Sequence, residues 1–158
     1  MKRDLPDIEI LLVEDNPDDA ELTVHALTKA NKAIRLLCLK DGAEALNYLF
    51  NYNLHLNEDD PGPRLVLLDL KLPKVDGLEV LRKIRANDRT RTLPVVILTS
   101  SAQKRDISEA YKLGVNSYVV KPVEFDSFVE KVSALALYWS QINKKPELTF
   151  EVDAQFVK

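Results

Sequence analysis

Five short runs of apolar residues recur along the chain, separated by longer segments in which apolar and polar residues mix. The runs cover residues 8–13, 34–39, 65–68, 94–98 and 117–120. Within each run the apolar residues are nearly continuous rather than alternating, which is typical of strands buried on both faces of a parallel sheet. The pattern therefore predicts five buried strands.

Segments with helical spacing separate these runs and follow the last of them. They cover residues 17–30, 42–52, 77–86, 102–113 and 124–142. A regular alternation of strand and helix indicates βαβ units, a parallel sheet and helices on both of its faces. We therefore expect an α/β fold, with a doubly wound, five-stranded parallel sheet.

The predicted strands and helices end at residue 142, and we expect residues 1–142 to form one domain of ordinary size. Residues 143–158 form a tail that alternates apolar and polar residues from Leu148 to Phe156. This alternation is typical of a half-buried strand, so we expect the tail to dock across the domain or its partner. The alternative is a disordered terminal segment.

Composition narrows the class of protein. The chain has 22 Lys and Arg against 25 Asp and Glu, a net charge of −3, which disfavours direct binding to nucleic acid. We find no run of about 18 apolar residues, so we expect no membrane span. The only cysteine, Cys38, cannot form an internal disulfide, and its apolar run predicts a core position. These features favour a soluble, cytoplasmic protein.

Polar residues follow four of the five apolar runs, and a parallel sheet brings such positions to one edge. Glu14 and Asp15 follow the first run, and Asp69 follows the third. Thr99 follows the fourth run and Lys121 the fifth. We therefore expect three carboxylates, a hydroxyl and an ammonium group to meet at one edge of the sheet.

Converging carboxylates repel one another, so their ionisation requires a cation. Oxygen ligands without a nearby His or Cys favour Mg²⁺. The charge of Lys121 and the hydroxyl of Thr99 suit a phosphoryl group, whose oxygens need neutralising. A carboxylate in such a site can act as a nucleophile and form an acyl phosphate, and Asp69 is the best candidate.

The motifs that contain these residues resemble the receiver domains of two-component response regulators, the CheY-like family. They follow the family's order and spacing over residues 8–142. They are LLVEDNPDD with Glu14 and Asp15, LVLLDLKLPKVDG with Asp69, VVILTSSA with Thr99, and SYVVKP with Tyr118 and Lys121. The resemblance implies a CheY-like fold and a signalling protein that catalyses only its own phosphorylation and dephosphorylation.

The resemblance also implies roles at the acidic end of the site. Asp69 accepts a phosphoryl group from the phosphohistidine of a sensor histidine kinase. Asp15, Asp69 and the backbone carbonyl of Lys71 hold Mg²⁺, and Glu14 acts on the ion directly or through water.

Further roles follow from the same resemblance. Lys121 pairs with the phosphoryl oxygens, Thr99 moves towards them, and Tyr118 swings inward. The surface formed by the fourth helix, fifth strand and fifth helix then changes its partner preference. The Lys121–Pro122 bond resembles a cis peptide of the family.

Two features narrow the resemblance to the phytochrome-associated single-domain response regulators. One is the long loop before the third apolar run, which ends PGPRLVLLDLKLP. The other is the sequence LALYW at residues 135–139. This closer resemblance implies a phytochrome-type histidine kinase as the partner.

The last helical segment carries more apolar residues than one core stripe requires. Helical spacing places in the stripe Phe125, Phe128, Val129, Val132, Leu135, Ala136 and Trp139. Leu137, Tyr138 and Ile142 fall partly outside it. They predict either a longer local core under the tail or a homodimer surface, which we favour.

Three other functions are less consistent with the sequence. A phosphatase that forms an aspartyl phosphate needs a second Asp two positions after the nucleophile, where this chain has Lys71. A receiver-shaped binding module without phosphorylation has no need for every acidic, Thr and Lys position to be filled. The four glycines do not form a phosphate-binding loop of a nucleotide-binding protein.

Overall fold

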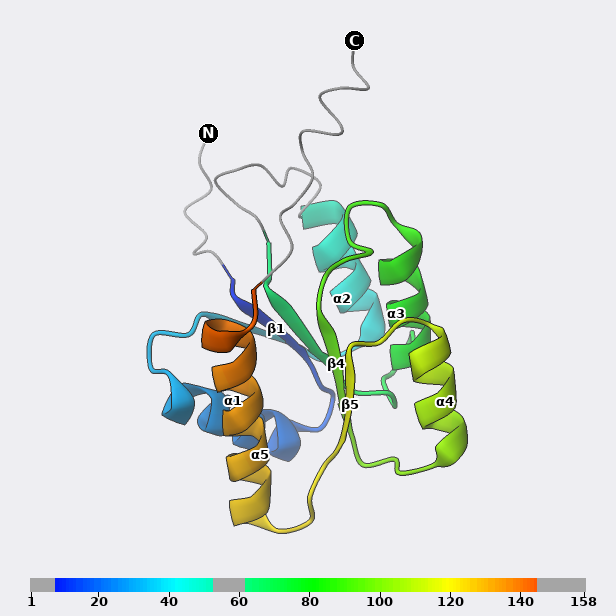
Figure 1. Ribbon diagram of the computed structural model, residues 1–158. Coiled ribbons are helices and arrows are strands. Elements are labelled where there is room, and N and C mark those ends of the chain that lie inside the picture. The colour runs from blue at the N-terminus through cyan, green and yellow to red at the C-terminus, as the bar shows by residue number, and fades with distance from the viewer. Residues whose placement is uncertain (1–7, 53–61, 145–158) are drawn as a thin grey trace, which may run out of the picture.

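The computed structural model of the chain describes residues 8–52 and 62–144 and contains a five-stranded parallel sheet (Figure 1). The strands are β1 (Ile10–Val13), β2 (Leu36–Leu39), β3 (Leu65–Leu68), β4 (Val95–Thr99) and β5 (Ser117–Val120). Their order in the sheet is β2-β1-β3-β4-β5, and every neighbouring pair is parallel. The predicted doubly wound sheet is therefore confirmed.

Five α-helices cover the two faces of this sheet. They are α1 (Pro17–Ala30), α2 (Gly42–Asn47), α3 (Gly77–Ala86), α4 (Lys104–Lys112) and α5 (Phe125–Leu137). Helices α1 and α5 lie on one face, and α2, α3 and α4 lie on the other (Figure 1). One π-helical turn, Tyr48–Tyr52, extends α2, and another, Tyr138–Ile142, extends α5. The helical segments expected at residues 42–52 and 124–142 therefore form. The last turn of each is a π-helix rather than an α-helix.

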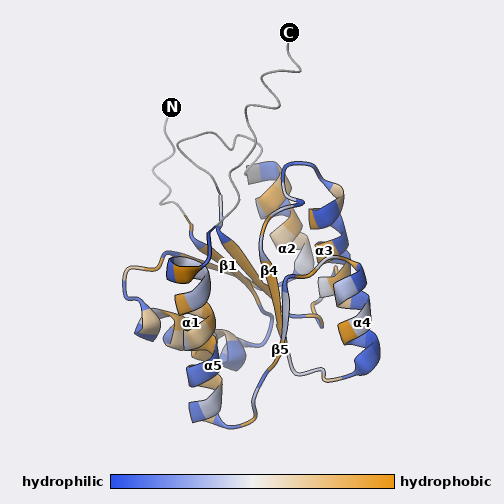
Figure 2. Cartoon of the chain, viewed as in Figure 1, coloured by the Kyte–Doolittle hydropathy of each residue, from blue (hydrophilic) through white to orange (hydrophobic). Residues whose placement is uncertain are grey.

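The core consists of two apolar layers, one on each face of the sheet. Beneath α2, α3 and α4, buried residues such as Leu68, Val80 and Ile97 pack together. Beneath α1 and α5, the buried residues include Leu67 and Val132. Figure 2 shows hydrophobic residues on the helices where they meet the sheet. The central strands β1, β3 and β4 are buried throughout, because each is paired on both sides and covered on both faces.

The two edge strands are less buried than the sequence predicts. Strands β2 and β5 each pair with only one neighbour, and their residues are mostly half-buried. Cys38 lies in β2 and is exposed. The expectation that Cys38 is a core residue is therefore wrong, because an apolar run does not reveal whether its strand is central or at an edge.

Helix α5 buries most of its expected stripe but not the first residue. Phe128 and Val132 are buried against α1 and the sheet. Phe125 is 58% exposed, so its place in the predicted stripe is wrong. It is the first residue of α5 and precedes the turn that packs on the sheet. At the other end of the helix, three apolar residues are exposed: Leu137, Tyr138 and Ile142.

Some expectations concern residues or bonds away from the core. The expected strand in the tail falls on residues 145–158, outside the described residues. The expected cis peptide at Lys121–Pro122 is wrong, because that bond is trans, the isomer that X–Pro bonds favour. Among the described helices, none is both long and apolar enough to cross a membrane.

Candidate functional site

The loop between β1 and α1 places two carboxylates at the carboxyl edge of the sheet. Glu14 and Asp15 follow the last residue of β1 directly. Asn16 caps α1, because its side-chain oxygen accepts hydrogen bonds from the backbone N–H groups of Asp18 at 2.9 Å and Asp19 at 3.0 Å. The backbone N–H of Asn16 also donates to Glu14 Oε2 at 3.2 Å. The cap therefore fixes Glu14 relative to the first turn of α1.

Asp69 lies at the end of β3, in the middle of the sheet, and is only 8% exposed. Its carboxylate accepts a hydrogen bond from the backbone N–H of Leu70 at 2.7 Å. The backbone of Gly77 packs so closely that a Cβ there would lie 2.1 Å from the carbonyl oxygen of Asp69. A residue without a side chain is therefore required where α3 begins.

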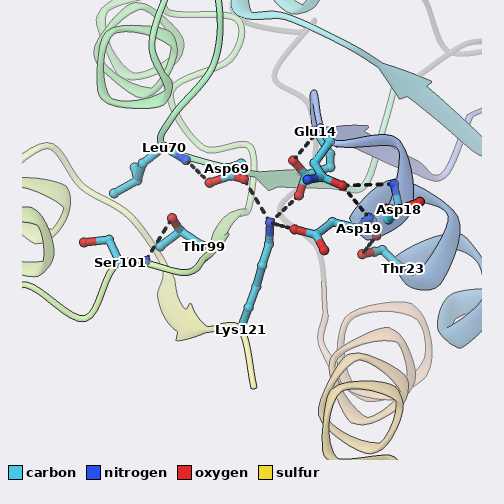
Figure 3. Close-up of polar contacts among 10 residues, drawn as sticks. Glu14, Asp18, Asp19, Thr23, Asp69, Leu70, Thr99, Ser101 and Lys121 are labelled. Atoms are coloured by element: carbon cyan, nitrogen blue, oxygen red, sulfur yellow. Dashed lines mark hydrogen bonds and ion pairs between the residues drawn. The ribbon is translucent and has the colours of Figure 1, made fainter. Parts of the chain in front are cut away.

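Lys121 follows β5 and is the centre of an ion-pair cluster (Figure 3). Its side chain is 7% exposed. The ammonium group donates to Asp69 Oδ2 at 2.9 Å, to Asp19 Oδ2 at 2.9 Å and to Glu14 Oε1. An ammonium group has three N–H donors, so three carboxylates satisfy it fully. The backbone N–H of Lys121 also donates to the Thr99 carbonyl at 2.7 Å, which ties β5 to β4.

Burial and neighbouring charges shift the pKa values of this cluster in different directions. Burial is the largest influence on Glu14 and, with the charge of Asp69, raises its pKa to about 7 against the opposing effect of Lys121. Burial also acts to raise the pKa of Asp69, but hydrogen bonds from Lys121 and Thr99 and the charge of Lys121 outweigh it and lower the pKa. Burial acts to lower the pKa of Lys121, but its three carboxylate partners raise it. At neutral pH the site therefore holds an ionised Asp69 beside a charged Lys121.

Three of the carboxylates are close enough to share a cation. Ligand oxygens of Glu14, Asp15 and Asp69 all lie within 4.8 Å of one another. Glu14 and Asp69 are buried, whereas Asp15 is exposed. The donor set consists of oxygen atoms alone, which fits a hard divalent cation. The sequence prediction of an acidic group at this edge of the sheet is therefore confirmed.

Thr99 lies at the end of β4 and is 1% exposed. Its side chain faces Asp69 closely enough to help lower the pKa of that carboxylate. Its hydroxyl also accepts a hydrogen bond of 3.4 Å from the backbone N–H of Ser101. The structure therefore brings Thr99 into the same site as Asp69, as its position after the fourth apolar run predicts.

Tyr118 contacts the loop after β4 rather than the carboxylates themselves. Its hydroxyl donates to the carbonyl oxygen of Ser101 at 2.9 Å. The Ser101 hydroxyl in turn donates to Asp106 of α4 at 2.5 Å. Tyr118 is half-buried in β5, and this chain of hydrogen bonds connects it to the residues that follow Thr99.

Lys71 and Asp19 flank the site in the loop after β3 and in the first turn of α1. Lys71 is exposed in the loop two residues after Asp69, and the metal-binding role of its carbonyl stays a prediction. Asp19, which binds Lys121, was not among the predicted site residues. The sequence does show that Asp19 is an acidic residue in the first turn of the helix after β1. Acidic residues are common there because they interact favourably with the helix dipole, so this position alone does not predict a contact with Lys121.

A doubly wound sheet of this strand order, with an acidic group, a threonine and a lysine at its carboxyl edge, defines a receiver domain. A model of the family described as the response regulator receiver domain matches residues 10–133, well over half of the chain. The chain belongs to this family. Receiver domains bind a divalent cation at this acidic site, and the family works with histidine kinases as partners.

Two curated proteins show the relationship in sequence. The probable methanogenesis regulatory protein FilR2 of Methanothrix harundinacea is 44% identical over 137 residues, which cover 87% of this chain and 86% of that protein. Response regulator Rcp1 of Synechocystis is 37% identical over 130 residues, which cover 82% of this chain and 87% of that protein.

Two crystal structures show the relationship in three dimensions. The Mn²⁺-bound form of Rcp1 has a TM-score of 0.78 at 35% identity, and the match covers 89% of this chain and 99% of that one. The phosphorylated cyanobacterial phytochrome response regulator RcpA has a TM-score of 0.80 at 34% identity, with the same coverage. The chain is therefore a receiver-domain response regulator homologous to Rcp1 and RcpA.

Proposed function

We propose that this protein is a switch that accepts a phosphoryl group on Asp69 from the phosphohistidine of a sensor histidine kinase. The observation that carries the proposal is the position of the Asp69 carboxylate. It is buried at the centre of the sheet edge, 2.9 Å from Lys121 Nζ, and close enough to Glu14 and Asp15 to share a cation with them.

The transfer is a displacement at phosphorus. A carboxylate oxygen of Asp69 forms a bond to phosphorus while the bond from phosphorus to the histidine nitrogen breaks, and the nitrogen keeps the electron pair. The low pKa of Asp69 keeps its carboxylate ionised and ready to attack. Lys121 donates to the transferred oxygens and offsets their charge.

The ion at this site is Mg²⁺ in our proposal, held by Asp15, Asp69 and the carbonyl of Lys71, with Glu14 acting directly or through water. The oxygen-only donor set supports a hard cation of this kind. When bound, Mg²⁺ neutralises the charge that develops on the phosphoryl oxygens. Glu14 must lose its proton to take part, because its pKa of about 7 leaves it partly neutral near that pH.

Thr99 and Tyr118 transmit the change in our proposal. Thr99 already contacts Asp69, so its hydroxyl is placed to follow a phosphoryl group formed there. The Tyr118 hydroxyl holds the Ser101 carbonyl two residues further on. A shift of Thr99 therefore moves the loop to which Tyr118 is bound, and α4, β5 and α5 change the surface they present.

We infer that the donor is a phytochrome-type histidine kinase. The similarity to RcpA, which is a phytochrome response regulator, supports this partner. FilR2, a probable methanogenesis regulator, is more similar in sequence than Rcp1, so the kinase class needs a direct test. Transfer from a purified phytochrome kinase in seconds to minutes, with none from an unrelated kinase at equal concentration, is the expected result.

The first test of phosphorylation is chemical. The protein is incubated with acetyl phosphate and Mg²⁺, and its intact mass is measured. We expect the addition of one phosphoryl group, its loss in Asp69→Asn, and its loss when EDTA removes the cation. Asp76→Asn is the matched control, because Asp76 is an exposed aspartate that only caps α3. No added mass, or continuous hydrolysis of an unrelated phosphate ester, contradicts the proposal.

We also propose that the protein forms a homodimer through the end of α5. Leu137 and Tyr138 are each 45% exposed and Ile142 is 60% exposed, so one end of the helix presents an apolar surface to solvent. Burying such a surface against a second copy removes apolar area from water and stabilises the pair.

Light scattering tests this dimer. We expect the wild type to have twice the chain mass of 17.9 kDa and the triple variant Leu137→Ser, Tyr138→Ser, Ile142→Ser to have the single mass. Tyr111→Ser in α4 is the control, because Tyr111 is also an exposed aromatic residue but lies on another helix. A wild type that is monomeric both with and without phosphorylation would refute the dimer.

A further inference from the structure

We propose that Asp19 is a positioning residue that holds Lys121 in place when a cation occupies the acidic site. This inference rests on the proposed function and adds a residue to its machinery. Asp19 lies in the first turn of α1, and its carboxylate accepts a hydrogen bond from Lys121 Nζ at 2.9 Å (Figure 3).

The argument starts from the acceptors that Lys121 shares. Its ammonium group binds Glu14, Asp19 and Asp69. Glu14 and Asp69 are also two of the three carboxylates that lie close enough to hold a cation. A cation and Lys121 therefore compete for the same carboxylate oxygens, because each is a positive charge that the oxygens must neutralise.

Asp19 differs from the other two partners of Lys121. Among the described residues, the group close enough to share a cation comprises Glu14, Asp15 and Asp69, and Asp19 is not in it. The side chain of Asp19 is 38% exposed, whereas those of Glu14 and Asp69 are 3% and 10% exposed. Asp19 therefore stays available to Lys121 when a cation attracts the oxygens of Glu14 and Asp69.

Hydrogen bonds hold the backbone of Asp19 in the first turn of α1. The N–H of Asp19 donates to the cap residue Asn16 at 3.0 Å, and its carbonyl accepts from the Thr23 hydroxyl at 2.7 Å. Asn16 also binds Glu14 through its own N–H. One cap residue therefore binds the Glu14 carboxylate and the Asp19 backbone, and Asp19 reaches the ammonium without belonging to the group that can share a cation.

In Asp19→Asn a neutral amide oxygen replaces the Asp19 carboxylate. Among the described residues, the charged partners that Lys121 keeps are then Glu14 and Asp69, which it shares with the cation. Lys121 therefore competes more strongly for these two carboxylates, and cation binding weakens. For Asp19→Asn we expect the dissociation constant for Mn²⁺ to rise about 5-fold, somewhat less than the loss of a group that orients a metal ligand usually causes. The smaller effect reflects the partial exposure of Asp19.

The experiment titrates the full chain with Mn²⁺ and measures free ion by electron paramagnetic resonance. Asp18→Asn is the matched control, because it removes the same charge from the same turn of α1 and Asp18 is exposed. Circular dichroism melting shows whether each variant folds. We expect Asp18→Asn to stay within about 2-fold of the wild type, because solvent and salt screen an exposed charge.

A second background separates positioning from simple charge attraction. In Lys121→Met the competitor is absent, so we expect Asp19→Asn to lose its extra effect and match Asp18→Asn. Equal effects of Asp19→Asn and Asp18→Asn in the wild-type background would overturn the inference. So would an undiminished effect of Asp19→Asn in Lys121→Met. A wild type that binds no Mn²⁺ instead refutes the proposed function.

Discussion

Replacing Glu14 with Gln in the metal-free protein should raise its stability relative to the wild type as the pH increases. Glu14 is 3% exposed and lies beside the Asp69 carboxylate. Gln keeps the shape of Glu and one acceptor oxygen, but it cannot ionise. Its NH₂ group replaces one of the two oxygens that accept from Lys121 and from the Asn16 N–H, a cost that does not change with pH. The change in relative stability with pH therefore reports the charge that Glu14 must carry above its pKa.

The magnitude follows from the shift in pKa. An ordinary Glu titrates at 4.5 and Glu14 titrates at about 7, so its ionisation costs about 3 kcal/mol more in the folded protein than in the unfolded chain. Because the folded pKa is the higher one, the stabilisation is fully present below pH 4.5 and is lost as the pH rises to about 7. Glu14→Gln does not suffer this loss. Its advantage over the wild type should increase by about 2 to 3 kcal/mol between pH 5 and pH 8.

Urea unfolding in EDTA at the two pH values measures this difference. Trp139 is the only tryptophan, so its fluorescence reports the transition. Glu130→Gln is the control, because it makes the same chemical change at an exposed position on α5, away from the buried site. A difference in unfolding free energy between Glu14→Gln and the wild type that is the same at pH 5 and pH 8 refutes the reasoning.

Two further substitutions test parts of the fold that support the site. Gly77→Ala adds a methyl group 2.1 Å from the Asp69 carbonyl oxygen. We therefore expect the free energy of unfolding to fall by about 2 kcal/mol and Mn²⁺ binding to weaken. Wild-type values for both would contradict this close approach. Arg85→Met removes three hydrogen bonds of 2.8 Å, to two backbone carbonyls and the Asn116 side chain. We expect a loss of about 2 kcal/mol with phosphorylation retained. Arg82→Met, which breaks only an exposed ion pair, should cost under about 1 kcal/mol, and equal losses in the two variants would contradict a special role for Arg85.

The central strands and the main site residues could be predicted because both depend on short stretches of the sequence. A strand paired on both sides and covered on both faces must be apolar throughout, so β1, β3 and β4 appear as apolar runs. Parallel strands place their carboxyl ends at one edge, so the polar residues that follow them must meet. This geometry explains why Asp69 and Lys121 are in contact although 52 positions separate them.

The exposure of Cys38 and Phe125 and the contact between Asp19 and Lys121 could not be predicted, because they depend on how distant parts of the chain pack together. Strand β2 has an apolar run like that of a central strand, but its place at the edge leaves Cys38 exposed. Phe125 fits the periodicity of α5, but the helix meets the sheet only from its second turn. The contact between Asp19 and Lys121 depends on the path of a long side chain across the site. Such contacts follow from tertiary packing rather than from spacing along the chain.

The ion-pair cluster also concentrates the electric field of the molecule. The carboxylates of Glu14, Asp19 and Asp69 bind the ammonium of Lys121, and Asp15 lies close to two of them. With all four carboxylates ionised, these groups have a formal charge of −3. The whole chain has the same net charge, which means that all other charges cancel. If Asp69 accepts a phosphoryl group as proposed, an anionic donor meets repulsion at this site until a divalent cation binds there. The order of arrival is thus set by charge, and added salt should speed the approach of the donor to the cation-free protein while it slows the approach of the cation.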